Sequence, residues 1–271
     1  MRIPILTSKW ATASRRFASV ALPLVVLPLF VHRAGAMSTL AFEIVEALGL
    51  VLAVLAILAA LVAFVRIWIT GDKGWGRAVI GFIIGAACLA PAGLLAADFL
   101  RYPVADEVTT DPLNPPPLLS AIVPVPPSAA VAARLAAAFP NLKPRTYPID
   151  PATVFSIVGG LVADDGWQVL RENEPDDGGN GGQINALAMS VFGFRDEVSI
   201  RLDPTADGTA VAVRSASLGP LHEPGAEGRR VQDFLAELDS RITAMQQGQP
   251  AGSDNAAPVP APPPPQRLGK R

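Results

Sequence analysis

Cysteine and histidine are scarce in this chain of 271 residues. One Cys and two His exclude a disulfide framework and leave no thiolate or imidazole cluster for zinc, haem or iron-sulfur chemistry. Charged residues are also few, at 17% of the chain, whereas an average soluble domain has roughly 25%. Half of the residues are hydrophobic, so the composition excludes a wholly soluble protein. We expect no metal site and no cofactor.

The apolar excess lies before residue 100, in three uncharged runs. Residues 47–65 and 78–97 are nineteen and twenty residues long, close to the roughly 20 that cross the hydrocarbon core of a bilayer as a helix. The run 17–31 is shorter and contains two prolines, but residues 34–37 can extend it. We therefore predict a membrane region of residues 1–101, with transmembrane helices at about 17–36, 45–67 and 78–97.

Lysine and arginine are unevenly distributed around these runs. Only Arg33 and Arg101 lie between the first two runs or just after the third, whereas seven precede the first run or separate the second from the third: Arg2, Lys9, Arg15, Arg16, Arg66, Lys73 and Arg77. Cationic residues are retained on the cytoplasmic side. We therefore predict an inner-membrane protein with a cytoplasmic N-terminus and a periplasmic C-terminal domain.

Residues 1–36 allow a second interpretation, a cleaved signal peptide. Ala34-Gly35-Ala36 has the small-x-small form of a cleavage site, although Arg33 within that site argues against cleavage. In both interpretations the next run enters the membrane from outside, so the C-terminal domain lies on the same face.

Two carboxyl groups and one thiol in or near the apolar runs are candidates for a functional role. Glu43 and Glu46 precede the core of the second run, and Cys88 lies within the third. Ionisable groups inside membranes are costly and usually functional, which would make the carboxylates an ion or proton site. Their place at the outer headgroup level instead favours two solvated side chains. We interpret Cys88 as a small apolar filler.

Proline dominates the sequence after the third run. Residues 102–151 contain twelve prolines, and each fixes φ and removes a backbone donor, so we predict an extended stalk at 102–144. One helix interrupts it from Ser128, its N-cap, to Phe139. Residues 246–271 contain seven further prolines and almost no bulky apolar residue, which predicts a disordered tail.

Residues 145–245 have the pattern of a small α+β domain. Asp150 and Pro151 begin a helix that runs to about Asp165, and a second amphipathic helix begins near Gly225. Between the two helices we predict strands at 167–172, 184–194, 196–202 and 209–217. The predicted fold class is therefore an α-helical membrane region followed by an antiparallel sheet of about four strands that two helices cover.

The apolar residues of the last two strands suggest a register. Placing Val198 opposite Val213, and Ile200 opposite Val211, matches the apolar faces of the two strands. This register sets Glu197 opposite Arg214, as an ion pair on the other face. Such cross-strand pairs help to specify register.

Three segments of this domain resemble a known family. They are Phe192-Gly-Phe-Arg-Asp-Glu-Val-Ser-Ile-Arg-Leu202, Gly208-Thr-Ala-Val-Ala-Val-Arg-Ser-Ala-Ser217 and Gly228-Arg-Arg-Val-Gln-Asp-Phe-Leu235. They look like the core of the domain of unknown function 1499 family, and the N-terminal region resembles its three-span membrane form in alphaproteobacteria. The resemblance implies an uncharacterised envelope protein, and it carries over no catalytic residue because none is established for the family. This chain has Glu223-Pro-Gly-Ala-Glu227 where members usually have an Asp-x-Gly-x-Asn-like run.

One polar constellation of the domain offers candidate binding residues. It comprises Arg195, Asp196, Glu197, Arg214, Ser215, Ser217, His222, Glu223, Arg229 and Arg230. In a functional interpretation, Arg214, Arg229 and Arg230, together with His222, hold a carboxylate or phosphate at a helix N-terminus. In a structural interpretation, Arg214 pairs with Glu197 and the other two arginines solvate the start of the helix. We favour the structural role, because acidic residues lie among the arginines.

Ser215, His222 and Glu223 do not make a convincing hydrolase triad. A nucleophile needs a base within hydrogen-bond reach that a third group orients, and adjacent His and Glu residues on one loop seldom provide that geometry. The sequence also has no Gly-x-Ser-x-Gly elbow. We therefore predict no catalytic residue.

The charge of the domain limits its partners. Residues 102–245 contain 19 acidic and ten basic residues, so the surface repels nucleic acid and anionic headgroups. We expect a non-enzymatic module that binds an envelope protein or an apolar, lipid-like molecule. The alternative is an envelope enzyme or enzyme subunit that acts on an anionic or lipid-like small molecule near His222 and Arg214.

Overall fold

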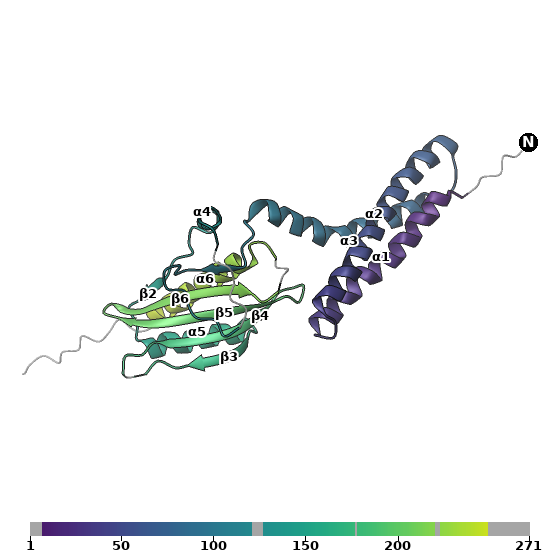
Figure 1. Cartoon of the computed structure of the whole chain (residues 1–271). Helices are drawn as coiled ribbons and strands as arrows, with labels where there is room; N and C mark the ends of the chain where they lie inside the picture. The colour runs from purple at the N-terminus through teal and green to yellow at the C-terminus, as the bar shows by residue number, and fades with distance from the viewer. Residues whose placement is uncertain (1–6, 121–126, 177, 220–222, 249–271) are drawn as a thin grey trace, which may run out of the picture.

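The computed structural model describes residues 7–120, 127–176, 178–219 and 223–248. Two parts follow one another along the chain, a group of three long helices and an α+β domain (Figure 1). Residues 246–248 of the tail predicted at 246–271 belong to the last helix, and residues 249–271 lie outside the described residues. The predicted fold class is confirmed, with differences in the sheet that are given below.

The three helices are α1 (Lys9–Arg33), α2 (Thr39–Thr70) and α3 (Trp75–Arg101). Each is long and apolar enough to cross a membrane, which agrees with the predicted membrane region. The helices α2 and α3 extend beyond both ends of the predicted spans, whereas α1 begins eight residues before the predicted span 17–36 and ends three residues before its end. The hydroxyl of Ser38 begins α2 by accepting the N–H of Ala41, and Gly71, in the left-handed conformation, ends it.

Small residues form the interface between these helices. The buried residues of α2 include five alanines, Ala53, Ala56, Ala59, Ala60 and Ala63. The hydroxyl of Ser14 on α1 donates to the Ala56 carbonyl at 2.8 Å. A Cβ on Gly81 of α3 would lie 2.1 Å from the Ser14 hydroxyl oxygen, so the two backbones approach closely there. Close approach and interhelical hydrogen bonds replace the hydrophobic effect as the source of helix association in lipid.

Six strands form one antiparallel sheet within the described ranges. They are β1 (Glu107–Thr109), β2 (Arg145–Tyr147), β3 (Gln168–Asn173), β4 (Gly182–Met189), β5 (Arg195–Thr205) and β6 (Gly208–Ser217). The order is β1-β6-β5-β4-β3, and β2 also pairs with β6. The four long strands correspond to the predicted ones. The short strand β1 lies near the start of the proline-rich residues 102–151, and β2 lies near their end. The many prolines there hid the alternating pattern that would have predicted a strand.

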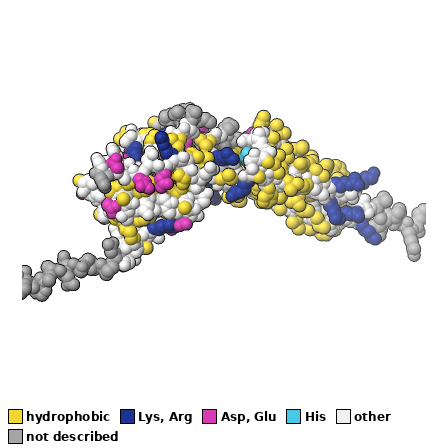
Figure 2. Space-filling view, turned by 90° about the horizontal axis from the view of Figure 1, so that it is seen from below, with side chains coloured by type: hydrophobic (Ala, Val, Ile, Leu, Met, Phe, Trp, Pro, Cys, Tyr) yellow, Lys and Arg dark blue, Asp and Glu magenta, His cyan; other side chains and the backbone are white. Residues whose placement is uncertain are grey.

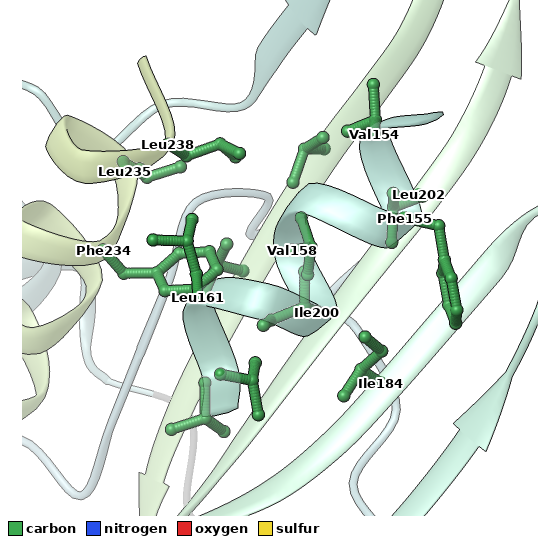
Figure 3. Packing of buried hydrophobic residues seen from close by; sticks show 14 of the residues in the cluster. Val154, Phe155, Val158, Leu161, Ile184, Ile200, Leu202, Phe234, Leu235 and Leu238 are labelled. Carbon is green, nitrogen blue, oxygen red and sulfur yellow. The ribbon is translucent and has the colours of Figure 1, made fainter. Parts of the chain in front are cut away.

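Two helices, α5 (Pro151–Asp164) and α6 (Ala226–Gly248), cover one face of the sheet. Asp150 caps α5 by accepting the N–H of Thr153 at 2.8 Å. The sequence predicts this cap, because Pro151 follows Asp150 directly and favours the first helical position. Residues of both helices pack against the strands, as Figure 3 shows for Val158, Leu161, Ile200, Phe234 and Leu235. This cluster is the core of the domain, because burial of apolar area is the main source of its stability.

The register of β5 and β6 differs from the prediction by two residues. Ile200 lies opposite Val213, and Ser199 lies opposite Arg214. Thr205 pairs with Gly208 across a two-residue turn, and that turn sets the register. Because side chains alternate with a period of two, a shift of two residues keeps every side chain on its predicted face. The hydrophobic pattern therefore does not distinguish the two registers.

The opposite, polar face of the sheet is covered by residues 110–120, which we call the strap. The carbonyl of Pro117 accepts hydrogen bonds from the side chains of Ser199 at 2.8 Å, Asn185 at 3.0 Å and Gln183 at 3.2 Å. The strap continues from β1, which pairs with β6. Residues 110–120 thus depart from the extended stalk predicted over 102–144, because the carbonyl of Pro117 finds donors on the sheet. Residues 121–126 of that stretch lie outside the described residues.

The domain lies directly against one end of the helices. The ring of Tyr102, which ends α3, stacks on Phe139 with ring centroids 5.2 Å apart. Phe139 ends α4 (Ala129–Ala138), the short helix predicted within the stalk, and packs closely on Gly228 of α6. Figure 2 shows an apolar helix surface beside the domain, with Lys and Arg side chains gathered at the end of the helices that is remote from it.

The close approach at Gly81 gives a prediction for the helix bundle. We expect Gly81→Leu to lower the melting temperature of the full chain in detergent, because the new side chain meets Ser14 and overpacking typically costs about 1–3 kcal/mol. Gly93→Leu on the same helix is the matched control, since nothing lies within 4 Å of a Cβ there. Equal melting temperatures for the two variants would contradict this packing.

Candidate functional site

Arg214, the central candidate of the sequence analysis, is engaged within the sheet. Its Nε donates to Glu107 Oε2 at 2.8 Å, and its Nη2 contacts the same oxygen. Nη1 donates to the carbonyl of Pro116 at 3.2 Å. Both members of the pair are buried, so the guanidinium is neutralised in place and joins β6 to β1 and the strap.

The predicted ion pair between Glu197 and Arg214 is therefore wrong. Glu197 lies opposite Ala216, and its carboxylate accepts the backbone N–H groups of Leu119 at 2.6 Å and Ser120 at 2.9 Å. Asn185 adds a side-chain hydrogen bond at 3.0 Å. The carboxylate is 1% exposed and binds the strap instead of a cation, which no sequence pattern could have indicated.

The other two candidate arginines lie in the first turns of α6 and each has its own carboxylate. Arg230 donates to Asp196 at 2.5 Å and to the hydroxyl of Ser215 at 2.9 Å. Arg229 pairs with Asp98 of α3 at 3.3 Å, and its guanidinium carbon lies 5.0 Å from the ring centroid of Tyr102. The arginines thus hold parts of the fold together and do not converge on one anion site.

His222, the remaining candidate, lies outside the described residues. Among the residues that are described, no three His, Cys, Asp or Glu side chains lie where they could share a metal ion. Ser215, the nucleophile of the rejected triad, accepts a hydrogen bond from Arg230. The Ser215 hydroxyl is therefore next to the cation of Arg230 and, within the described part of the chain, not next to a base that could take its proton.

Carboxyl groups cluster at the start of α6, beside Asp196. Glu227 is 1% exposed and one of its oxygens has no hydrogen-bond partner within the described residues. Burial, and next the negative charge of the nearby Asp196, raise the pKa of Glu227 to about 8, although Arg230 acts in the opposite direction. Burial also raises the pKa of Glu223, whose carboxyl is hydrogen-bonded to Ser190. Glu227 is therefore largely protonated at neutral pH.

The position of Glu227 on its helix could have been found from the sequence. It lies four residues before Val231 and seven before Phe234, on the stripe of α6 that packs into the core. Residues at these spacings share one face of a helix. A carboxyl at the start of an apolar stripe is the signal that the sequence analysis missed.

A cavity of about 400 Å³ lies between the domain and the turn that joins α1 to α2. The end of α1, the turn and the start of α2 supply His32, Gly35, Met37, Ser38 and Thr39. The domain supplies Gly193, Phe194, Arg195, Leu218 and Gly219. We call this the junction cavity. Sequence reasoning placed Arg195 in the polar constellation but could not bring the two parts of the chain together.

Aromatic rings form one wall of the junction cavity. The ring of His32 stacks on Phe42 with centroids 4.6 Å apart, and Phe194 meets His32 edge-on at 5.9 Å. His32 Nδ1 lies 3.2 Å from the carbonyl of Met37, which holds the turn. Arg195 is exposed, and within the described ranges no carboxylate pairs with it. Among the described residues, the cavity thus combines apolar walls with the guanidinium of Arg195.

Comparison with known proteins identifies the domain but no activity. Residues 107–238 match the model of the family described as protein of unknown function (DUF1499). The match begins at β1 and ends within α6, so it includes the strap. No curated protein matches the chain.

The buried carboxyl of Glu227 gives a pH prediction. Its pKa in the folded protein, about 8, lies above that of an unfolded Glu, so the folded state binds the proton more tightly and stability falls as pH rises from about 4.5 to about 8. We expect the free energy of unfolding of Glu227→Gln to fall by about 2 kcal/mol less over this pH range than that of the unchanged protein. Denaturant unfolding of the full chain at pH 5 and pH 8 measures the difference.

Asp233→Asn is the matched control for this measurement. Asp233 lies on the same helix and is exposed, so its substitution removes the same charge without a buried group. If Glu227→Gln and Asp233→Asn have the same pH dependence of stability, the raised pKa of Glu227 is wrong.

Proposed function

We propose that this chain, which belongs through residues 107–238 to the DUF1499 family, is an integral membrane protein whose α+β domain binds a lipid-like molecule in the junction cavity. The observation that carries the proposal is the place of the cavity, between the ends of membrane-competent helices and the domain. In this role the protein is a non-catalytic binding or envelope-maintenance module.

The chemistry of the cavity favours an amphipathic ligand. Met37, Phe194 and Leu218 give it apolar walls, and Arg195 gives it a cation next to the hydroxyl-bearing start of α2. Ligand pockets typically have volumes of about 300–1,000 Å³ and combine apolar walls with a few polar groups. A cavity of about 400 Å³ accommodates a headgroup with the first part of an acyl chain.

Binding fits the described residues better than catalysis does. The alternative, an envelope enzyme acting near His222 and Arg214, needs a free cation at Arg214. That guanidinium is buried against Glu107, and it also binds the carbonyl of Pro116. A cation that is already neutralised and hydrogen-bonded binds a substrate anion only if the strap moves.

We place the domain in the periplasm and the helices in the inner membrane. The support is the distribution of Lys and Arg, which gather at the end of the helices remote from the domain (Figure 2). Cationic flanks are retained in the cytoplasm, so the opposite end, with the domain, faces outward.

The ligand is tested with the full chain purified from membranes in mild detergent. Native mass spectrometry should detect a bound lipid, and Leu218→Trp should reduce its occupancy several-fold, because the larger ring fills the junction cavity. Leu170→Trp is the matched control, since Leu170 is exposed on β3, away from the cavity.

Two results would contradict this function. Equal lipid occupancy in Leu218→Trp and Leu170→Trp would exclude the junction cavity as the binding site. Turnover of a hydrolase substrate that disappears in His222→Ala would favour the enzyme instead.

Orientation has a separate test. Alkaline phosphatase fused after Arg271 should be active and a cytoplasmic fluorescent reporter at the same position should be dark. The reverse pattern would place the domain in the cytoplasm.

A further inference from the structure

The connection between β4 and β5 is an apolar tip at one end of the sheet. It runs Met189-Ser-Val-Phe-Gly-Phe194 and contains no charged residue. Val191 is 73% exposed and Met189 is 44% exposed. Figure 1 shows this end of the sheet turned toward the helices, whereas the β5–β6 turn lies at the other end. An apolar tip of this kind is unusual on a domain that is otherwise acidic.

The tip is attached to the end of α1. Arg33, the last residue of that helix, donates from Nη1 to the carbonyls of Ser190 at 3.0 Å and Val191 at 3.2 Å. Gly193, with φ +89°, lets the tip approach, since a Cβ there would lie 3.2 Å from the Cα of Arg33. Two parts of the chain that are far apart in sequence thus meet at this helix end.

This helix end lies at the border of the hydrocarbon core. The 25 residues of α1 are about 37 Å long, slightly more than the roughly 30 Å of the core. Phe30, one turn before the end, is 63% exposed on the helix surface. In a bilayer that α1 crosses, the tip would therefore lie level with the lipid headgroups.

The connection from α3 keeps the domain at this level. Only residues 102–106 separate the end of α3 from β1, and five extended residues span at most about 18 Å. Tyr102 is also fixed by its stacking on Phe139. The domain cannot move far from the membrane surface without breaking β1 from β6.

We propose that the β4–β5 tip is a membrane-contact surface, with Val191 and Met189 in the headgroup region of the bilayer that holds α1 to α3. Arg33 and Arg195 flank the tip, and such cations extend their charge to lipid phosphates while their stems stay among apolar groups. Apolar contact explains how an acidic domain rests on a membrane. The inference depends neither on the ligand of the junction cavity nor on which side of the membrane the domain occupies.

The test measures the depth of the tip in the full chain, reconstituted in phosphatidylcholine nanodiscs. A Cys88→Ala background receives Val191→Cys, labelled with a polarity-sensitive fluorophore. We expect blue-shifted emission and at least threefold stronger quenching by headgroup or shallow acyl-chain nitroxide lipids than at the control position. Asp207→Cys is that control, since Asp207 is exposed in the β5–β6 turn at the other end of the sheet.

Met189→Cys provides a second position on the tip in case the first variant fails to fold, and it should behave like Val191→Cys. Equal quenching of tip and control labels by nitroxide lipids, with equal access to aqueous iodide, would overturn the proposal. Protection of the tip label that depends on protein concentration and not on nitroxide lipid would also overturn it, in favour of contact with a second copy of the chain.

Discussion

The arrangement of this protein depends on the short connection between α3 and β1, because β1 is paired with β6. Five residues join the two elements, and β1 is held to β6 both by backbone pairing and by the buried pair of Glu107 with Arg214. The domain is consequently tied to the ends of the helices. The junction cavity, the attachment of Arg33 to the β4–β5 tip and the stacking of Tyr102 all follow from this proximity.

Three ion pairs of the domain help to hold this arrangement together. Arg214 holds β1, Arg229 holds Asp98 at the end of α3, and Arg230 holds Asp196 beside the buried carboxyl of Glu227. The pairs of Arg214 and Arg230 are the more deeply buried ones, and breaking a buried pair leaves an uncompensated charge, which costs about 3–5 kcal/mol. The three arginines that resemble an anion site in the sequence thus hold parts of the fold together. Arg195, which pairs with no carboxylate among the described residues, lines the junction cavity instead.

Much of the fold could be predicted, because local patterns carry it. Length and hydropathy indicate the three helices, the pairing of Asp150 with Pro151 indicates α5, and the alternation of apolar residues indicates β5 and β6. The register of those two strands could not be predicted, since a shift of two residues preserves the same faces. The strap was missed for a different reason: Pro117 has no N–H of its own, and its donors lie on β4 and β5, more than 60 residues further along the chain.

The sequence by itself determined which segments are long and apolar enough to cross a membrane and which face of each element is apolar, because hydropathy and periodicity are properties of neighbouring residues. Only the tertiary structure decided which partner each buried charge has. The carboxylate of Glu197 binds the backbone of the strap, and Glu107 takes Arg214. It also decided that residues 110–120 of the proline-rich segment lie on the polar face of the sheet. These outcomes depend on hydrogen bonds between residues far apart in the chain, whose geometry is set when the sheet forms and not by any local pattern.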